Sequence, residues 1–227
     1  MDSLSRRGVF GTVAAAAAAC WGPAAKTRAA ETGPAGPKIA LVHATDLFRP
    51  HADPDDHFDL ATVFALAAQG RFELLAVLID HPPAGLDADP DVQAVAQMNR
   101  ITGLAVPALT GSLRKTAAPV GAPDEDTDPA VGAKALLEFL RRSPKPVAIS
   151  VVGSCRDVAL AGELEPKLFA AKCAGVYLNA GSGTPDRAQA ARLEYNGALE
   201  PVSYPARFPL PWPVYWVPGF GVAPGGG

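Results

Sequence analysis

The sequence has few of the residues that mark zinc-binding, disulfide-rich and nucleic-acid-binding proteins. Only 3 of its 227 residues are cysteines, and it contains no Cys-x-x-Cys pair or Cys/His cluster typical of a zinc site. Basic residues are not in excess, because the formal net charge is −3 at pH 7. This balance argues against a nucleic-acid-binding domain. Outside the N-terminus no apolar run reaches the length of a membrane-spanning helix, so we expect no integral membrane domain.

Three common catalytic and nucleotide-binding motifs are also missing. There is no Walker A loop, no Gly-x-Ser-x-Gly elbow and no Gly-x-Gly-x-x-Gly after the first predicted strand, which argues against an NTPase, a serine esterase and a dinucleotide-binding protein. What remains is a chain that is 48% hydrophobic and 19% charged. That composition and length predict a single globular domain with a sizeable core.

The N-terminal residues have the layout of an export signal. Residues 1–30 combine an Arg pair, an Ala-rich apolar segment and small residues at their end, and the string SRRGVF resembles a twin-arginine motif. An unpacked N-terminal arm and a lipoprotein signal at Cys20 are two other interpretations. We expect a twin-arginine-type signal peptide, a linker over 31–37 and one domain over 38–227, in a protein exported to the periplasm or the medium.

Export would expose the remaining two cysteines to an oxidising compartment. Cys155 and Cys173 are far apart in the sequence, and their spacing alone does not predict a disulfide. A disulfide and two separate buried thiols both stay open at this point.

Apolar runs and helical periodicity alternate along the rest of the chain. Alternation of this kind indicates βαβ crossovers and therefore an α/β fold, a mostly parallel Rossmann-like sheet with helices on both faces. The chain from Pro205 onward is rich in Pro and Gly, so the C-terminal part looks incomplete, and residues 114–128 are predicted to form a loop or lid. The predicted strands cover 38–45, 72–80, 106–111, 146–154, 173–181 and 213–217, and the predicted helices cover 59–70, 90–103, 129–143 and 158–172.

Carboxylates are concentrated immediately before the first predicted helix. Like charges this close repel one another unless a cation or a helix N-terminus offsets them. One interpretation is a site for a hard cation such as calcium, although the EF-hand pattern is missing. The other is helix capping, for which Asp59 is the best candidate because it adjoins the apolar run. The group comprises Asp46, Asp53, Asp55, Asp56 and Asp59.

Further polar residues follow other predicted strands. Asp80 ends the second long strand, Ser154 ends the strand over 146–154, and Asn179 lies near the end of the strand over 173–181. In an open parallel sheet, ligands bind outside the carboxyl ends of the strands. We therefore expect these residues and the acidic group to share one rim.

Five strings in the same order resemble the inosine–uridine nucleoside hydrolase family. They cover roughly residues 38–204. The Asp-rich loop resembles the family's DxDPGxDD, the turn GSCRD its GPLTN, and LEYNGALEP its AEFN…DP segment; the other two are PDVQAVAQMNRITGLAVPALTG and VYLNAGSG.

The resemblance implies a calcium-dependent hydrolase that cleaves the N-glycosidic bond of a ribonucleoside or related glycoside. In such an enzyme the metal holds a water and the ribose diol, and a loop Asp takes the proton of the water. A small-molecule substrate is the implied partner, and nucleic acid is not. The implied roles are metal ligation by Asp56, by Asp46 or Asp53 and by the carbonyl of Val152, base catalysis by Asp55, and hydrogen bonding of ribose hydroxyls by Glu194 and Asn196. From their places at the strand ends, Asp80 and Asn179 are further candidate substrate-binding residues.

Several positions depart from the family pattern. Asp157 replaces an amide, Glu200-Pro201 replaces Asp-Pro, and no Asp or His follows Asp186, so the family's last metal-binding Asp is missing. A second hypothesis is therefore an inactive or truncated member that binds a sugar, nucleoside or cation. A third is a generic exported sugar-binding domain. An uncovered sheet edge would favour aggregation or a partner, and a homo-oligomer is among the expected assemblies.

Overall fold

The computed structural model describes residues 38–47, 54–80, 90–113, 128–184, 186, 188, 194–201, 203 and 212–219. All of them belong to one unit that covers residues 36–227. The proposed signal segment, Asp53 and most of the predicted loop over 114–128 lie outside the described residues. Within that coverage, no helix is both long and apolar enough to cross a membrane.

Six strands form a single parallel sheet in this part of the chain, in the order β3-β2-β1-β4-β5-β6. This is the predicted fold class, a parallel α/β sheet with helices on both faces. The strands are β1 (Ile39–Thr45), β2 (Phe72–Ile79), β3 (Ala108–Thr110), β4 (Val147–Val151), β5 (Cys173–Ser182) and β6 (Val214–Gly219).

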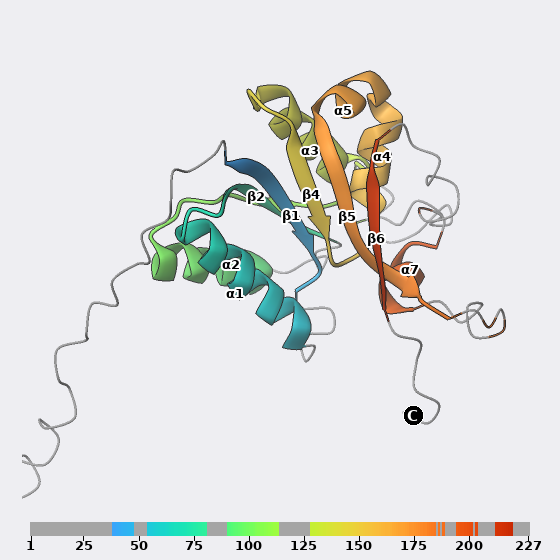
Figure 1. Cartoon of the computed structure of the whole chain (residues 1–227), viewed down its shortest axis with the longest axis horizontal. Coiled ribbons are helices and arrows are strands. Elements are labelled where there is room, and N and C mark those ends of the chain that lie inside the picture. The colour runs from blue at the N-terminus through green and yellow to red at the C-terminus, as the bar shows by residue number, and fades with distance from the viewer. Residues whose placement is uncertain are drawn as a thin grey trace, which may run out of the picture. The chain divides into compact units, whose positions relative to one another are not determined.

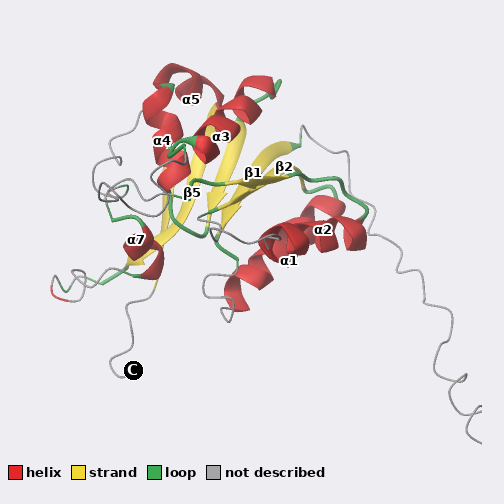
Figure 2. Cartoon of the chain, turned by 180° about the vertical axis from the view of Figure 1, so that it is seen from behind, coloured by secondary structure: helices red, strands yellow, loops and turns green. Residues whose placement is uncertain are grey.

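The helices cover the two faces of the sheet unequally. Those of one face, α1 and α2, pack on β1 and β2 around Leu60, Phe64 and Val95, whereas α3, α4 and α5 pack on the other face around Leu136, Leu140 and Phe169. Figure 1 shows α1 and α2 beside β1 and β2, and Figure 2 shows α3 to α5 from behind. The helices are α1 (Pro54–Ala68), α2 (Pro90–Thr102), α3 (Val131–Arg142), α4 (Arg156–Leu164), α5 (Pro166–Lys172) and α7 (Tyr195–Leu199).

Three helical details differ from the sequence predictions. The first helix begins at Pro54 instead of Asp59, because proline fits the first helical position, where its missing N–H is not needed. The helix predicted over 158–172 is two helices that meet at Glu165, since the residue before a proline is disfavoured in the α region. The one-turn helix α7 was not predicted.

Both described cysteines are buried and neither forms a disulfide. Cys155 and Cys173 belong to the core beneath α3, α4 and α5. Burial raises the pKa of the Cys173 thiol to about 11, so this side chain behaves as an apolar group. The sequence left open whether the two cysteines form a disulfide or are separate buried thiols, and the structure supports separate buried thiols.

Candidate functional site

The order of the strands reverses between β1 and β4. The chain passes outward from β1 through β2 to β3 and then returns to pair β4 with the other side of β1. Because of this reversal, the loops that follow β1 and β4 lead away from each other. In open α/β sheets, ligands bind between two such loops. Here the residues at that point are Asp46, which follows β1, and Val152 to Ser154, which follow β4.

Asp46 is packed against the turn that follows β4. Its side chain is buried, with 1% exposed, and a Cβ atom added to Gly153 would lie 3.1 Å from both the Asp46 backbone nitrogen and Oδ1. The Val152 N–H donates to the carbonyl of Ala44 at 2.9 Å, which keeps the two segments together. Asp46 is therefore at the centre of the rim where the sequence predicted it, and its role as a metal ligand stays a prediction.

The other described carboxylates of the acidic group belong to the first two turns of α1. Asp56 is buried and Asp55 is exposed in the first turn, where the helix dipole favours negative charge. Asp59 is in the second turn, so its interpretation as the helix cap is wrong. Burial raises the pKa of Asp59, and the nearby charge of Asp55 adds to this effect.

The described residues contain no group of three or more His, Cys, Asp and Glu side chains that could hold a metal ion. Asp46, Asp55 and Asp56 therefore do not form a complete metal site by themselves. Asp53, the alternative first ligand, lies outside the described residues.

Helix α7 lies over the ends of β4 and β5 and is tied to both. The Glu194 carboxylate caps the helix, accepting hydrogen bonds from the N–H groups of Asn196 at 2.8 Å and Gly197 at 3.2 Å, and it also accepts from the N–H of Gly181 in β5 at 2.5 Å. Capping of this kind satisfies backbone donors that the first turn of a helix leaves without partners.

The side-chain amide of Asn196 joins α7 to two strands. Its Nδ2 donates to the carbonyl of Val152 at 3.0 Å and to the carbonyl of Asn179 at 2.9 Å. Asn179 itself is exposed. The structure thus brings Asn179, which the sequence placed at the rim, together with Val152, Glu194 and Asn196, whose roles the family resemblance implied.

The carboxylate of Asp80 forms hydrogen bonds in the interior of the protein. It is buried, with 2% exposed, and its two oxygens accept hydrogen bonds from the N–H of Ser154 at 2.9 Å and from the hydroxyl of Ser154 at 2.8 Å. This carboxylate joins the end of β2 to the turn after β4. The role of Asp80 in substrate binding stays a prediction.

A buried polar network beneath the rim was missed by the sequence analysis. Arg156 is fully buried, and its Nε donates to Glu200 at 3.1 Å while its Nη1 donates to the carbonyl of Ser112 at 2.5 Å. Asp157 accepts from the N–H of Ser112 at 3.1 Å and from its hydroxyl at 2.5 Å. Two adjacent charged residues at the start of an apolar helix are the sequence signal that points to this network.

Asp157 lies in a narrow space beside α3. A Cβ atom added to Gly132 would lie 2.5 Å from Cγ of Asp157, so only glycine fits at this close approach. The pKa of Asp157 is raised to about 6, mainly by burial; the hydrogen bonds from Ser112 and the charge of Arg156 act against this rise, and the charge of Asp80 adds to it. This carboxyl group therefore changes its protonation state near pH 6.

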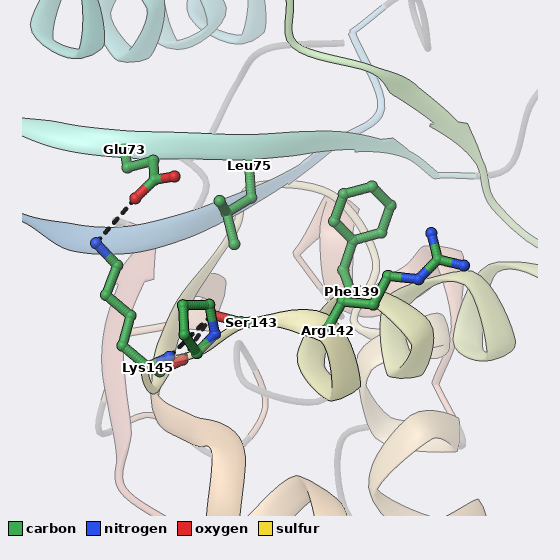
Figure 3. A pocket seen from close by; sticks show the side chains of 7 residues that line it. Glu73, Leu75, Phe139, Arg142, Ser143 and Lys145 are labelled. Carbon is green, nitrogen blue, oxygen red and sulfur yellow. Dashed lines mark hydrogen bonds and ion pairs between the residues drawn. The ribbon is translucent and has the colours of Figure 1, made fainter.

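A small hollow of about 180 Å³ lies at the opposite, amino end of the strands. Figure 3 shows it between the start of β2 and the turn that joins α3 to β4, with Leu75 and Phe139 on its walls. Lys145 at its edge forms an ion pair with Glu73 at 2.8 Å. This hollow is separate from the rim and contains none of the predicted site residues.

The fold is similar to those of solved nucleoside hydrolases. An inosine–uridine preferring nucleoside hydrolase from Bacillus anthracis is 14% identical over 80% of this chain and 65% of that chain, with a TM-score of 0.57. An inosine–guanosine nucleoside hydrolase is 15% identical over 80% and 62%, with a TM-score of 0.59. The type III effector XopQ complexed with adenosine diphosphate ribose is 20% identical over 82% and 59%, with a TM-score of 0.60.

These similarities establish a divergent nucleoside hydrolase-like fold, as the resemblance of the five strings implied. The chain spans between 59% and 65% of the length of those three structures. No protein-family profile matches the sequence, and no curated protein sequence matches it.

Proposed function

We propose that this chain is a nucleoside hydrolase-like protein that binds a ribonucleoside or a related glycoside at the rim and hydrolyses its N-glycosidic bond. The observation that carries the proposal is the convergence of Asp46, Val152, Asn179, Glu194 and Asn196 at the carboxyl ends of β1, β4 and β5. Asn196 joins α7 to β5 and to the turn after β4 through its hydrogen bonds to Asn179 and Val152. The similarity of the fold to two nucleoside hydrolases supports the same substrate class.

The polar groups of α7 suit the recognition of a ribose. Glu194 presents a carboxylate and Asn196 an amide at the same helix N-terminus, and such groups hydrogen-bond sugar hydroxyls. The structure of XopQ contains adenosine diphosphate ribose, a second ribosyl compound. We therefore include it among the ligands to be tested.

Calcium fits the rim only in part. The carboxylate of Asp46 and the carbonyl of Val152 are oxygen donors of the kind that calcium prefers. Asp56 would add a second carboxylate, and Asp53 is the alternative to Asp46. When bound, the ion would lower the pKa of a water molecule. No described group of three acidic side chains completes the site, so we derive no step of the reaction through the metal.

The proposed base is Asp55. Its carboxylate is exposed in the first turn of α1, where water reaches it. The transition state for cleavage of a glycosidic bond develops positive charge on the sugar ring, and nearby carboxylates stabilise it.

A second candidate function is binding of a sugar, nucleoside or cation without turnover. The incomplete set of metal ligands among the described residues favours it, because a poorly held water reacts slowly.

One experiment separates the two functions. The purified protein is titrated with calcium in the presence and absence of ribose, and base release is measured with inosine, uridine, guanosine and adenosine diphosphate ribose. Calcium-dependent release supports hydrolysis, binding without release supports the second function, and the absence of any ribosyl or calcium binding would reject both.

We also propose that residues 1–30 form a twin-arginine-type export signal and that residues 31–37 link it to the domain. The support is the SRRGVF string followed by an Ala-rich segment. Replacement of Arg6 and Arg7 by Lys should reduce the exported fraction in a cell-fractionation assay. Unchanged export of the double variant would reject the twin-arginine route.

A further inference from the structure

Arg156 connects three segments that are far apart in the sequence. Its guanidinium donates to Glu200 after α7 and to the carbonyl of Ser112 after β3, and its Nη2 lies 3.8 Å from Oδ1 of Asp80 at the end of β2. Arg156 is 0% exposed and Glu200 is 1% exposed. A buried guanidinium is held in one geometry by such partners, because leaving its donors without them is costly.

Helix α7 depends on contacts outside itself. It is five residues long, which is far below the length at which a helix is stable alone. At its N-terminal end Glu194 and Asn196 bond to β5 and to the turn after β4. At its C-terminal end the described anchor is the ion pair between Glu200 and Arg156.

We propose that Arg156 is a positioning residue that holds α7 in place through Glu200, and thereby sets the orientation of Glu194 and Asn196 at the rim. The Arg156–Glu200 pair and the Asn196 bonds fix the two ends of one helical turn, so loss of either end lets the turn rotate about the other. The effect on ligand binding rests on the proposed function, whereas the effect on the order of α7 does not.

The geometry of the guanidinium explains why lysine cannot replace it. Arginine reaches Glu200 with Nε and Ser112 with Nη1 at the same time because its donors form a rigid planar fork. The single ammonium of lysine keeps the positive charge beside Asp80 and Glu200, but it cannot donate hydrogen bonds to both Glu200 and Ser112 in the same geometry. Arg156→Lys therefore tests the position of the donors separately from the charge, whereas Arg156→Met would leave two buried carboxylates without their cation and risks unfolding.

The first arm of the test is amide hydrogen exchange of the full chain. In Arg156→Lys and in Glu200→Gln, exchange in the peptide over 194–200 should be about 10- to 100-fold faster, the effect of weakening one charge-assisted hydrogen bond on local opening. Peptides of β1 and β2 should exchange as in the wild type. The matched control is Arg142→Lys, because Arg142 is an exposed arginine that pairs with Glu138 on α3. Unchanged exchange over 194–200 in both variants, or an equal rise throughout the protein, would overturn the proposal.

The second arm measures inosine binding by calorimetry. If Arg156 positions α7, the variants should bind inosine about 10-fold more weakly, with an unchanged number of sites per protein molecule. If the variants only lose folded protein, they should show fewer sites per protein molecule and an unchanged affinity. The second result would overturn the role of Arg156 in ligand binding. If the wild type does not bind inosine, that part of the proposed function fails, and the exchange arm still decides whether Arg156 positions α7.

Discussion

Two buried groups should make the stability of this fold depend on pH in opposite directions. His43 in β1 is fully buried, and burial lowers its pKa from 6.5 to about 4. Asp157 at the start of α4 is also buried, and burial is the main cause that raises its pKa from 3.8 to about 6. Because a difference of one pKa unit corresponds to about 1.4 kcal/mol, each residue should change the free energy of unfolding by about 3 kcal/mol across its range.

The direction of each pH effect on the free energy of unfolding depends on whether the folded or the unfolded chain binds the proton more tightly. Between pH 4 and 6.5 the unfolded chain takes up a proton at His43 that the folded protein does not, so this residue lowers the free energy of unfolding as the pH falls. Between pH 3.8 and 6 the folded protein keeps a proton on Asp157 that the unfolded chain releases, so this residue lowers the free energy of unfolding as the pH rises. The two ranges overlap, and we expect the two effects largely to cancel in the wild type.

Single substitutions should therefore reveal each effect. Asp157→Asn keeps groups that can bond to Ser112 and removes the titration, so its free energy of unfolding relative to the wild type should rise by about 2 kcal/mol between pH 4.5 and pH 7.5. His43→Leu removes the titration of His43. Its free energy of unfolding relative to the wild type should therefore fall by about the same amount over the same pH range. Urea denaturation at pH 4.5, 5.5, 6.5 and 7.5 measures both.

The double variant serves as the control for this experiment. Its difference from the wild type should vary little with pH, because the two opposite contributions largely cancel in the wild type and both are absent from the double variant. Parallel stability profiles for the wild type and both single variants would refute the assignment of these two protonation states.

Three further outcomes are expected. Gly153→Ala places a methyl group 3.1 Å from Asp46 and should cost about 1–3 kcal/mol in urea denaturation, together with weaker calcium binding; unchanged values would contradict the close approach. Glu194→Ala removes the cap of α7 and should cost about 1–2 kcal/mol, measured in the same way; a cost no larger than that of a substitution at an exposed loop position would argue against the cap. Of the two candidate functions, binding without turnover predicts that inosine and uridine release little or no base, since a misplacement of about 1 Å can reduce a rate about 100-fold. Robust calcium-dependent base release that Asp55→Asn abolishes would overturn this last expectation.

The order and type of most elements were predictable from the sequence. Apolar runs such as the one from Phe72 to Ile79 bury both faces of a parallel strand, and glycines closed the two helices that were expected to end at Gly70 and Gly103. The shared rim was predictable for the same reason, because the carboxyl ends of parallel strands meet at one edge of a sheet. The start of α1 and the break before Pro166 were missed because the predictions followed apolar periodicity and gave too little weight to proline.

The partner of each charged side chain was decided only by the tertiary structure. Asp80 and Asp46 both follow buried strands, yet Asp80 bonds to Ser154 and Asp46 lies against Gly153 at the point where the strand order reverses. Likewise, Arg156 meets a carboxylate 44 positions away. Hydrophobic periodicity reflects which face of an element is buried, so the sequence by itself determined the sheet, its helices and the rim. The charge pairs depend on side chains that packing brings together from distant segments, and for that reason only the folded chain assigned Asp80 to the interior and Arg156 to α7.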